Sequence, residues 1–248
     1  METALNIFAN CWWIALITGV IAYLLGSINT AVMVTSIVTK GKDIRKMGSG
    51  NAGFTNVLRS VGKVPAIITI VCDALKCVVA VLLGGFIFSQ LAVPMFDPSN
   101  AILSSELVVV GKYVAGVCCI LGHSYPLYFG FKGGKGVVSA AGLMLSEDWR
   151  VFLLILGTFL IIFIITKVIS IASISCAALY APYTFLVTFF FDMSKGYTLS
   201  YVIFSTVSAL LIGIFVIVKH KENIKRIIRG EEKKITAKKK SSTPTRNS

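Results

Sequence analysis

The chain has 248 residues, of which 56% are hydrophobic and 14% charged, and its mean hydropathy is +0.83. This composition excludes an ordinary soluble globular domain and indicates a protein embedded in a lipid bilayer. The formal net charge of +13 favours a nucleic-acid partner only weakly, because basic loops beside anionic lipid account for it.

Seven apolar segments follow one another along the chain, and we expect them to form a bundle of membrane helices. The first, from Cys11 to Thr39, has no charged residue, and its 29 residues exceed the roughly 20 that cross a bilayer. The fourth, 136–146, is too short to span a bilayer alone at about 1.5 Å per residue. It would begin inside the preceding loop or be a partial helix buried among the others. The remaining segments are 64–96, 107–122, 151–166, 168–191 and 197–218.

The basic residues lie mainly on alternate connections between these segments. Six fall in residues 40–63, two are Lys132 and Lys135, one is Lys167, and eleven fall in residues 219–248. The positive-inside rule assigns these connections to the cytoplasm. Residues 1–10 contain no Lys or Arg, so the N-terminus can lie outside. The apolar segments predict an all-α integral membrane protein. We expect a seven-transmembrane helical bundle with cytoplasmic Gly-rich loops, its N-terminus outside and its C-terminus inside.

The domain organisation follows from the same pattern. We expect a single transmembrane domain over residues 1–235. Residues 236–248 are rich in Lys, Ser and Thr, and we expect them to form a disordered basic cytoplasmic tail. The six cysteines all lie within apolar segments and form no CxxC pair, so neither disulfides nor a metal site is expected.

The loop over residues 40–63 combines glycine with polar and basic side chains. Gly48, Gly50 and Gly53 have the GxGxxG spacing, but they follow a membrane helix instead of a strand, so we reject a dinucleotide-binding fold. Glycine lets the backbone approach an anion closely, and arginine can bind phosphate oxygens through two N–H groups. We therefore predict that this loop binds phosphate. The residues expected to bind the phosphate are Arg45, Gly48, Ser49, Gly50, Asn51, Thr55, Asn56 and Arg59.

A second glycine-rich loop covers residues 122–136. It fails as a nucleotide-binding P-loop, because Phe129 stands where the first glycine should be and Lys135 is followed by Gly136 in place of Ser or Thr. Its proline and aromatic residues favour a re-entrant segment in the membrane interface. The turn over residues 133–136 would then open the next helix and place Lys135 at a helix N-terminus, where free amides attract anions.

The last apolar segment continues into a third basic stretch, residues 219–231. His220, Asn223 and Arg226 are spaced three residues apart and share one face of a helix that leaves the bilayer. Alone, this stretch would be an ordinary basic helix beside anionic lipid headgroups. Together with the two loops, it gives the chain three basic segments on one predicted face.

These three segments resemble, in order and topology, the three motifs of the bacterial acyl-phosphate:glycerol-3-phosphate acyltransferases. They are DIRKMGSGNAGFTNVLRSVGK at 43–63, GHSYPLYFGFKGGKG at 122–136 and HKENIKRIIRGEE at 220–232. Residues 168–173 and the pair Asp73 and Lys76 are also similar to that family. The resemblance covers roughly residues 20–235.

The resemblance implies a multi-pass enzyme of the bacterial cell membrane, with seven helices and no cofactor. The enzyme would move a fatty acyl group from acyl phosphate to the 1-hydroxyl of sn-glycerol 3-phosphate. The products would be lysophosphatidate and phosphate, in the first step of phospholipid synthesis. On the same grounds, the enzyme that forms the acyl phosphate is an expected partner.

The resemblance also assigns roles to the residues that match the motifs. The implied catalytic residues are Ser49, Lys135, His220 and Asn223. The implied phosphate-binding residues are Arg45, Gly48, Gly50, Asn51, Thr55, Asn56, Arg59, Gly133, Gly134, Ser170 and Ser173.

Two routes for the proton of the acceptor hydroxyl are open in such a reaction. Acyl phosphate is already an activated anhydride, so much of the catalysis would come from positioning the hydroxyl near its carbonyl. His220 could act as the general base. We favour the phosphate of the donor as the base, because the sequence shows no carboxylate paired with His220.

A different acyltransferase chemistry would need other residues. Glycerolipid acyltransferases of the acyl-CoA type use a His-x4-Asp motif. The fifth residue after His123 is Tyr128, and the fifth after His220 is Lys225. The sequence therefore lacks the parts of that mechanism.

A membrane transporter of an organic phosphate is the remaining alternative. Asp73 and Lys76 lie within an apolar segment, where ionisable residues often line a substrate path. The same two residues could instead form a structural pair between helices. Because the two halves of the sequence show no inverted repeat, we favour the enzyme.

Overall fold

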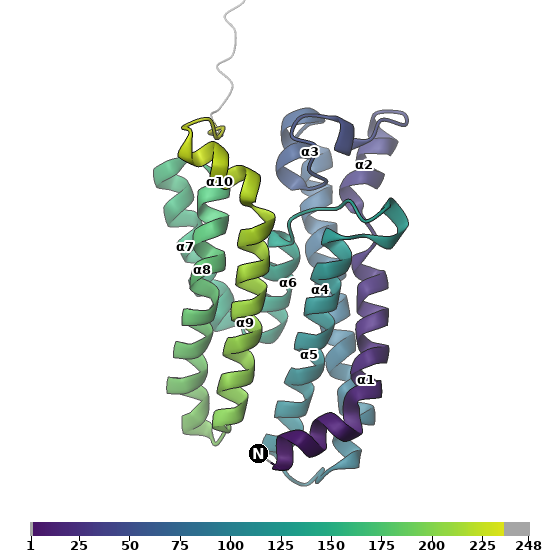
Figure 1. Cartoon of the computed structure of the whole chain (residues 1–248), viewed down its shortest axis with the longest axis vertical. Helices are drawn as coiled ribbons and strands as arrows, with labels where there is room; N and C mark the ends of the chain where they lie inside the picture. Colours follow the sequence, from purple (N-terminus) through teal and green to yellow (C-terminus); the bar gives the residue numbers. More distant parts are fainter. Residues whose placement is uncertain (1, 236–248) are drawn as a thin grey trace, which may run out of the picture.

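The computed structural model of the protein describes the backbone of residues 2–235 and the side chains of residues 10–235 (Figure 1). Every regular element within this part of the chain is helical, so the predicted all-α architecture is confirmed. The tail expected over residues 236–248 lies outside the described residues.

Six helical stretches are long and apolar enough to cross a membrane, and they run alongside one another in Figure 1. They are built on α1 (Glu2–Gly26), α4 (Lys63–Leu91), α5 (Ala101–Ser124), α7 (Trp149–Thr166), α8 (Ile169–Val187) and α9 (Leu199–Lys219). The shorter helices are α2 (Thr30–Val38), α3 (Phe54–Ser60), α6 (Val137–Glu147) and α10 (Lys221–Ile228). Single turns lie between them at η1 (Ile44–Lys46), η2 (Val93–Met95), η3 (Leu127–Phe129), η4 (Thr188–Asp192) and η5 (Met193–Lys195).

The first apolar segment contains a helix break that its hydropathy does not indicate. α1 ends at Gly26, and α2 begins after Asn29, whose Oδ1 accepts a hydrogen bond from the Val32 N–H at 3.1 Å. Asparagine in this position caps a new helix without adding charge, so the run of apolar residues continues through the break. The break also leaves the Ile28 carbonyl free of a helical partner, and Lys76 of α4 donates to it at 2.7 Å.

The long helices form two groups. In the first group α4 packs against α1, α5 and α6, and in the second α8 packs against α7 and α9. Small residues allow close approach within the first group, since a Cβ added to Gly84 of α4 would lie 2.5 Å from the Gly111 carbonyl oxygen of α5. Helices in lipid gain little from burying apolar surface against one another, so such close backbone packing contributes directly to their association.

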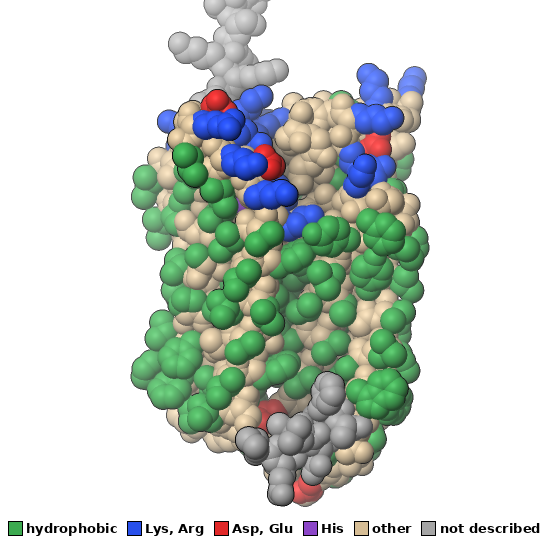
Figure 2. Space-filling model, in the orientation of Figure 1, with side chains coloured by type: hydrophobic (Ala, Val, Ile, Leu, Met, Phe, Trp, Pro, Cys, Tyr) green, Lys and Arg blue, Asp and Glu red, His purple; other side chains and the backbone are tan. Residues whose placement is uncertain are grey.

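The surface of the bundle is divided between an apolar belt and a basic end (Figure 2). Large apolar side chains on the long helices, among them Ile67, Leu75, Leu153 and Ile164, are exposed. Lys and Arg side chains gather at the end that carries α2, α3 and α10. An exposed apolar belt with a basic end is the surface expected of a protein that lies in a membrane.

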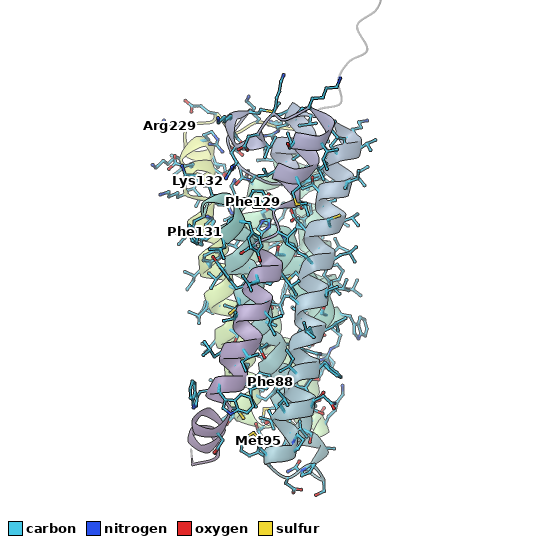
Figure 3. All side chains as sticks on the ribbon, turned by 90° about the vertical axis from the view of Figure 1, so that its right-hand side faces the viewer. Phe88, Met95, Phe129, Phe131, Lys132 and Arg229 are labelled. Carbon is cyan, nitrogen blue, oxygen red and sulfur yellow. The ribbon has the colours of Figure 1, made fainter. Side chains whose placement is uncertain are left out.

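The loop between α5 and α6 folds back onto the end of α5. The Gly134 N–H donates to the His123 carbonyl at 3.1 Å, so the loop runs beside the last turn of that helix. Phe131 and Lys132 lie exposed on its outer side (Figure 3). α6 then begins after Gly136, which has φ +83°, a conformation that favours glycine.

The end of α6 lies beside the middle of α5. Lys112 of α5 donates to the Ser146 carbonyl at 3.3 Å and lies 3.4 Å from the Glu147 carboxylate. Beside them Arg150, at the start of α7, binds Asp192, which follows α8, at 2.8 Å. The fourth apolar segment forms the 11-residue helix α6, which is shorter than the six helical stretches long enough to cross a membrane.

Candidate active site

A cavity of about 460 Å³ lies between the two groups of helices, beside α3 and α10 of the basic end. Its polar side chains come from segments that are far apart in the chain. They are Ser49, Asn51, Thr55, Asn56, Arg59, Asp73, His123, Lys135, Ser170, Ser173, His220, Asn223, Arg226 and Glu232. The rest of its wall is apolar and includes Ile70 of α4, Val138 of α6, and Phe159 and Phe163 of α7.

The cavity brings together ten of the residues implied as catalytic or phosphate-binding. These ten are Ser49, Asn51, Thr55, Asn56, Arg59, Lys135, Ser170, Ser173, His220 and Asn223. Arg45, Gly48, Gly50, Gly133 and Gly134 do not line it. The two sets differ in what they do: the first faces the cavity, and the second shapes the loops around it.

Asn56 of α3 holds the first glycine-rich loop in place. Its buried amide donates to the carbonyls of Met47 and Asn51 at 2.9 and 3.0 Å, and its Oδ1 accepts from the Ser49 N–H at 3.0 Å. Gly48 has φ +54°, and a Cβ there would lie 2.3 Å from the Asn56 Oδ1. The loop can therefore wrap around the asparagine only with glycine at this position, and wrapping places Ser49 at the cavity.

The position of Arg45 does not match its predicted role. Its guanidinium binds the Asp43 carboxylate, with Nη2 to Oδ2 at 2.7 Å, and also donates to the Phe129 carbonyl. These contacts join the first loop to the second and keep the side chain away from the cavity. The Asp43 partner stands only two residues away, so a local pair competes with any phosphate.

Gly133 and Gly134 are needed for close packing. A Cβ at Gly133 would lie 2.0 Å from the His123 carbonyl oxygen, and one at Gly134 would lie 2.2 Å from the His123 Nε2. Contacts this short would force the loop off α5. The glycines thus fix the course of the loop and so the position of Lys135, which follows them.

Lys135 enters the cavity from the second loop. Its ammonium donates to the Asn223 Oδ1 of α10, which links the second and third motifs. Burial lowers the pKa of Lys135 to about 8; Glu232 opposes this effect, while Arg226 and Arg59 add to it. Lys135 is therefore a cation whose charge depends on an anion nearby.

Glu232 provides an anion within the cavity, and the sequence analysis did not single it out. Its side chain is 6% exposed, and its carboxylate accepts from Ser170 Oγ at 2.6 Å, Asn223 Nδ2 at 2.8 Å and Arg226 Nε at 2.6 Å. Burial raises the pKa of this carboxyl, but these three hydrogen bonds outweigh burial and hold the pKa below its usual range. The sequence feature that could have indicated Glu232 is the acidic pair at 231–232, at the end of a strongly basic segment.

His220 lies where α9 meets α10 and is 3% exposed. Its Nδ1 lies 2.7 Å from the Val216 carbonyl, which can only accept, so Nδ1 carries a proton and donates. Burial lowers the pKa of His220 to about 4, the backbone hydrogen bond opposes this, and the charge of Lys135 adds to it. The imidazole is therefore neutral at pH 7, with Nε2 as an acceptor and a weak base.

Asp73 and Lys76 form a pair inside the first group of helices. The Lys76 Nζ lies 2.8 Å from the Asp73 Oδ1 and 3.1 Å from the His123 Nδ1. Asp73 and His123 also line the cavity. The sequence analysis left the role of the acid–base pair open and gave His123 no role. The sequence feature that pointed to His123 was its position in the second motif segment, residues 122–136.

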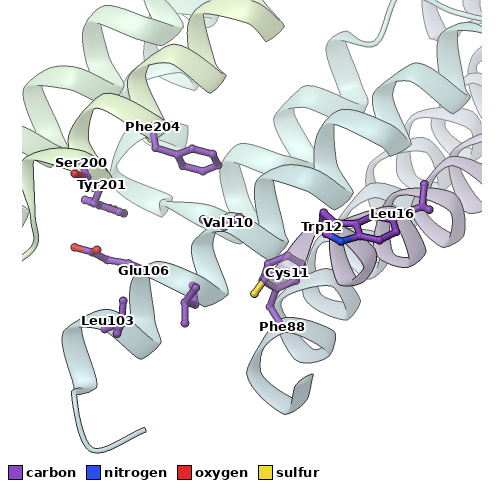
Figure 4. A pocket seen from close by; sticks show the side chains of 12 residues that line it. Cys11, Trp12, Leu16, Phe88, Leu103, Glu106, Val110, Ser200, Tyr201 and Phe204 are labelled. Atoms are coloured by element: carbon purple, nitrogen blue, oxygen red, sulfur yellow. The ribbon is translucent and has the colours of Figure 1, made fainter. Parts of the chain in front are cut away.

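A second, larger cavity of about 720 Å³ lies between α1, α4, α5 and α9 and differs in chemistry (Figure 4). Its described lining contains no Lys, Arg or His. Glu106 is its charged residue, and the carboxylate accepts from the Thr198 N–H at 2.7 Å. An apolar groove with a carboxylate repels phosphate, so the first cavity is the candidate active site. Among residues 2–235, no group of three His, Cys, Asp or Glu side chains is placed to hold a metal ion.

Comparison with known sequences finds matches over most of the chain. A sequence profile described as "Glycerol-3-phosphate acyltransferase" matches residues 16–230. A glycerol-3-phosphate acyltransferase of Prochlorococcus marinus (strain MIT 9312) is 38% identical over 215 residues, which cover 87% of this chain and 94% of that protein. One of Clostridioides difficile (strain 630) is 36% identical over 227 residues, which cover 90% of this chain and 97% of that protein.

Two solved structures are also similar. Both are crystal structures of PlsY (YgiH), described as an integral membrane glycerol 3-phosphate acyltransferase. One is the glycerol 3-phosphate form and the other the lysophosphatidic acid form. Each has a TM-score of 0.66 and 34% sequence identity over 90% of this chain, covering 96% and 95% of the respective PlsY chains.

Proposed function

Because the chain belongs to the glycerol-3-phosphate acyltransferase family, we propose that it transfers a fatty acyl group from an acyl phosphate to the 1-hydroxyl of sn-glycerol 3-phosphate. The products are lysophosphatidate and inorganic phosphate. As a multi-pass membrane acyltransferase, the protein takes part in phospholipid biosynthesis. The observation that carries the proposal is a cavity with three cations in which a hydroxyl, an amide and a guanidinium already bind one carboxylate.

The acceptor and product follow from the chemistry of that cavity. Glycerol 3-phosphate and lysophosphatidic acid, the molecules named for PlsY, both carry a phosphate monoester with about −1.5 to −2 charges near pH 7. Arg59, Lys135 and Arg226 supply charged donors, and Ser170 and Asn223 supply neutral ones. Like a phosphate, the Glu232 carboxylate is an acceptor only, so donors that satisfy it are suited to phosphate oxygens.

An acyl phosphate donor suits both halves of the cavity. Its phosphate adds a second anion, and the three cations reduce the repulsion between the two phosphates. Its hydrocarbon chain suits the apolar wall formed by Ile70, Val138, Phe159 and Phe163, whose side chains are half-buried. Such a donor is supplied by an enzyme class that forms acyl phosphates, and we propose such an enzyme as the partner.

In the proposed reaction the acceptor hydroxyl attacks the carbonyl carbon of the donor, and the bond from that carbon to the phosphate oxygen breaks. The hydroxyl proton leaves with the phosphate. With a pKa of about 4, His220 is a weak base, whereas the donor phosphate becomes more basic as its bond to the acyl carbon breaks. This difference supports the donor phosphate as the proton acceptor. We assign His220, Ser49 and Asn223 to positioning the two substrates.

We further propose that the basic end of the bundle faces the cytoplasm of a bacterial cell membrane, with the N-terminus outside. Lys and Arg gather at that end, and the positive-inside rule places such an end in the cytoplasm. Seven crossings result when the loop before α6 and α6 together count as the fourth. This orientation gives soluble glycerol 3-phosphate direct access to the cavity.

The orientation can be tested by cysteine labelling in intact cells. In a variant without native cysteines, Lys42→Cys, in the first glycine-rich loop, is expected to react with a membrane-impermeant thiol reagent only after lysis. Ser99→Cys, between α4 and α5, is expected to react in intact cells. Both positions are exposed, so accessibility within the fold does not separate them. The reverse labelling pattern would contradict the orientation.

The charge on Lys135 predicts the pH dependence of the reaction. The protonated form binds phosphate, so kcat/KM for glycerol 3-phosphate is expected to fall above about pH 8 as the free enzyme loses this proton. Bound phosphate raises the pKa of Lys135, so kcat is expected to fall only at higher pH. In Lys135→Arg the guanidinium stays charged, and the fall near pH 8 is expected to disappear. An identical alkaline limb in that variant would show that another group titrates.

The donor is tested with purified protein in detergent. We expect it to convert palmitoyl phosphate and glycerol 3-phosphate to lysophosphatidate in the presence of a chelator and without ATP. Palmitoyl-CoA is expected to react poorly, and Lys135→Ala to lower the rate at least about tenfold, because a charged hydrogen bond contributes about 1.5–3 kcal/mol. Efficient use of palmitoyl-CoA would contradict the proposed donor. Uptake of glycerol 3-phosphate into sealed vesicles without acyl product would indicate a transporter.

A further inference from the structure

The hydrogen bonds of Lys76 determine which nitrogen of His123 carries the proton. A lysine ammonium has three N–H donors and no acceptor. Three acceptors surround this one: the Ile28 carbonyl at 2.7 Å, the Asp73 Oδ1 at 2.8 Å and the His123 Nδ1 at 3.1 Å. Each N–H of Lys76 thus has one partner, and the His123 Nδ1 acts as an acceptor.

Asp73 does not reverse this assignment. Its Oδ1 lies 3.5 Å from the His123 Nδ1, which is longer than the 2.7 Å bond from Thr30 and the 2.8 Å contact with Lys76 that the same oxygen accepts. An N–H···O hydrogen bond has its usual range at about 2.7–3.2 Å. His123 is therefore a neutral imidazole with its proton on Nε2.

The other ring nitrogen, Nε2, belongs to a side chain that lines the cavity. The ring is 4% exposed and lines the cavity, and its Nε2 has no hydrogen-bond partner among residues 10–235. Gly134 borders the same nitrogen so closely that a Cβ there would lie 2.2 Å from it. The result is a donor held at a fixed position beside the loop that carries Lys135.

This donor stands apart from the groups suited to phosphate. Lys135, Asn223 and Arg226 are joined to one another or to Glu232. His123 is held instead by Lys76 of α4, which also donates to the Ile28 carbonyl before α2. A neutral N–H is a weaker ligand for a phosphate than these cations, but it is suited to an oxygen that becomes negative only during the reaction.

We propose that the His123 Nε2–H donates a hydrogen bond to the carbonyl oxygen of the acyl donor and stabilises the oxyanion that forms when the acceptor hydroxyl attacks. The proton stays on Nε2 throughout, and His123 forms no covalent bond. Lys76, Asp73 and Thr30 are positioning residues, because they hold the ring in the tautomer that donates. The proposal rests on the acyl transfer proposed above.

The test compares two amides at position 123. The nitrogen of Gln can reach the place of the imidazole Nε2, whereas the shorter Asn reaches only the place of Nδ1. We expect His123→Asn to lower kcat with palmitoyl phosphate about 10²-fold or more, as the loss of one oxyanion donor does. We expect His123→Gln to keep kcat within about tenfold of the unchanged protein. The KM for glycerol 3-phosphate should change less than about threefold in both.

The controls separate catalysis from folding. The exposed Tyr128→Phe, in the same loop, should leave kcat unchanged, and the thermal midpoint of each variant in detergent is measured alongside. A raised KM for glycerol 3-phosphate with unchanged kcat would overturn the proposal in favour of phosphate binding. Equal kcat losses in the Asn and Gln variants, or no loss in either, would also overturn it. If the unchanged protein does not use palmitoyl phosphate at all, the proposed acyl donor fails before the variants are compared.

Discussion

The convergence of cations on a cavity partly withdrawn from water is the constraint on which the rest of this structure depends. Arg59, Lys135 and Arg226 come from three distant segments, and their like charges repel, while burial removes hydration from Lys135. Glu232 supplies the compensating charge, and Asn223 connects it to Lys135. The lowered pKa of Lys135 shows that this compensation is incomplete, which leaves the site suited to a further anion.

Hydrogen bonds and close packing around the cavity hold the two loops and His123 in place. Asn56 fastens the first loop through its amide, and Gly134 lets the second loop pack against His123. Lys76 and Asp73 pair within α4, so two ionisable groups in an apolar helix are satisfied and at the same time orient the imidazole. Buried ionisable residues that pair in this way need not form a transport path, although their sequence pattern alone allows one.

Hydropathy and charge were sufficient to predict a helical membrane protein with three basic segments, because these features depend on residue type and not on exact position. They did not predict the break between α1 and α2, since the cap at Asn29 carries no charge. Ten predicted site residues share one cavity, but Glu232 escaped notice because its partner Ser170 lies 62 residues away. Arg45 was assigned to phosphate although its partner Asp43 was visible two residues earlier.

The most direct test is a structure determined with glycerol 3-phosphate bound. The account predicts the phosphate in the cavity between the two groups of helices, at hydrogen-bond distance, about 3 Å, from the ammonium of Lys135 and from at least one of Arg59 and Arg226. A phosphate bound instead at the outer surface of the basic end, beside Arg45 or Lys132, with the cavity unchanged, would contradict it.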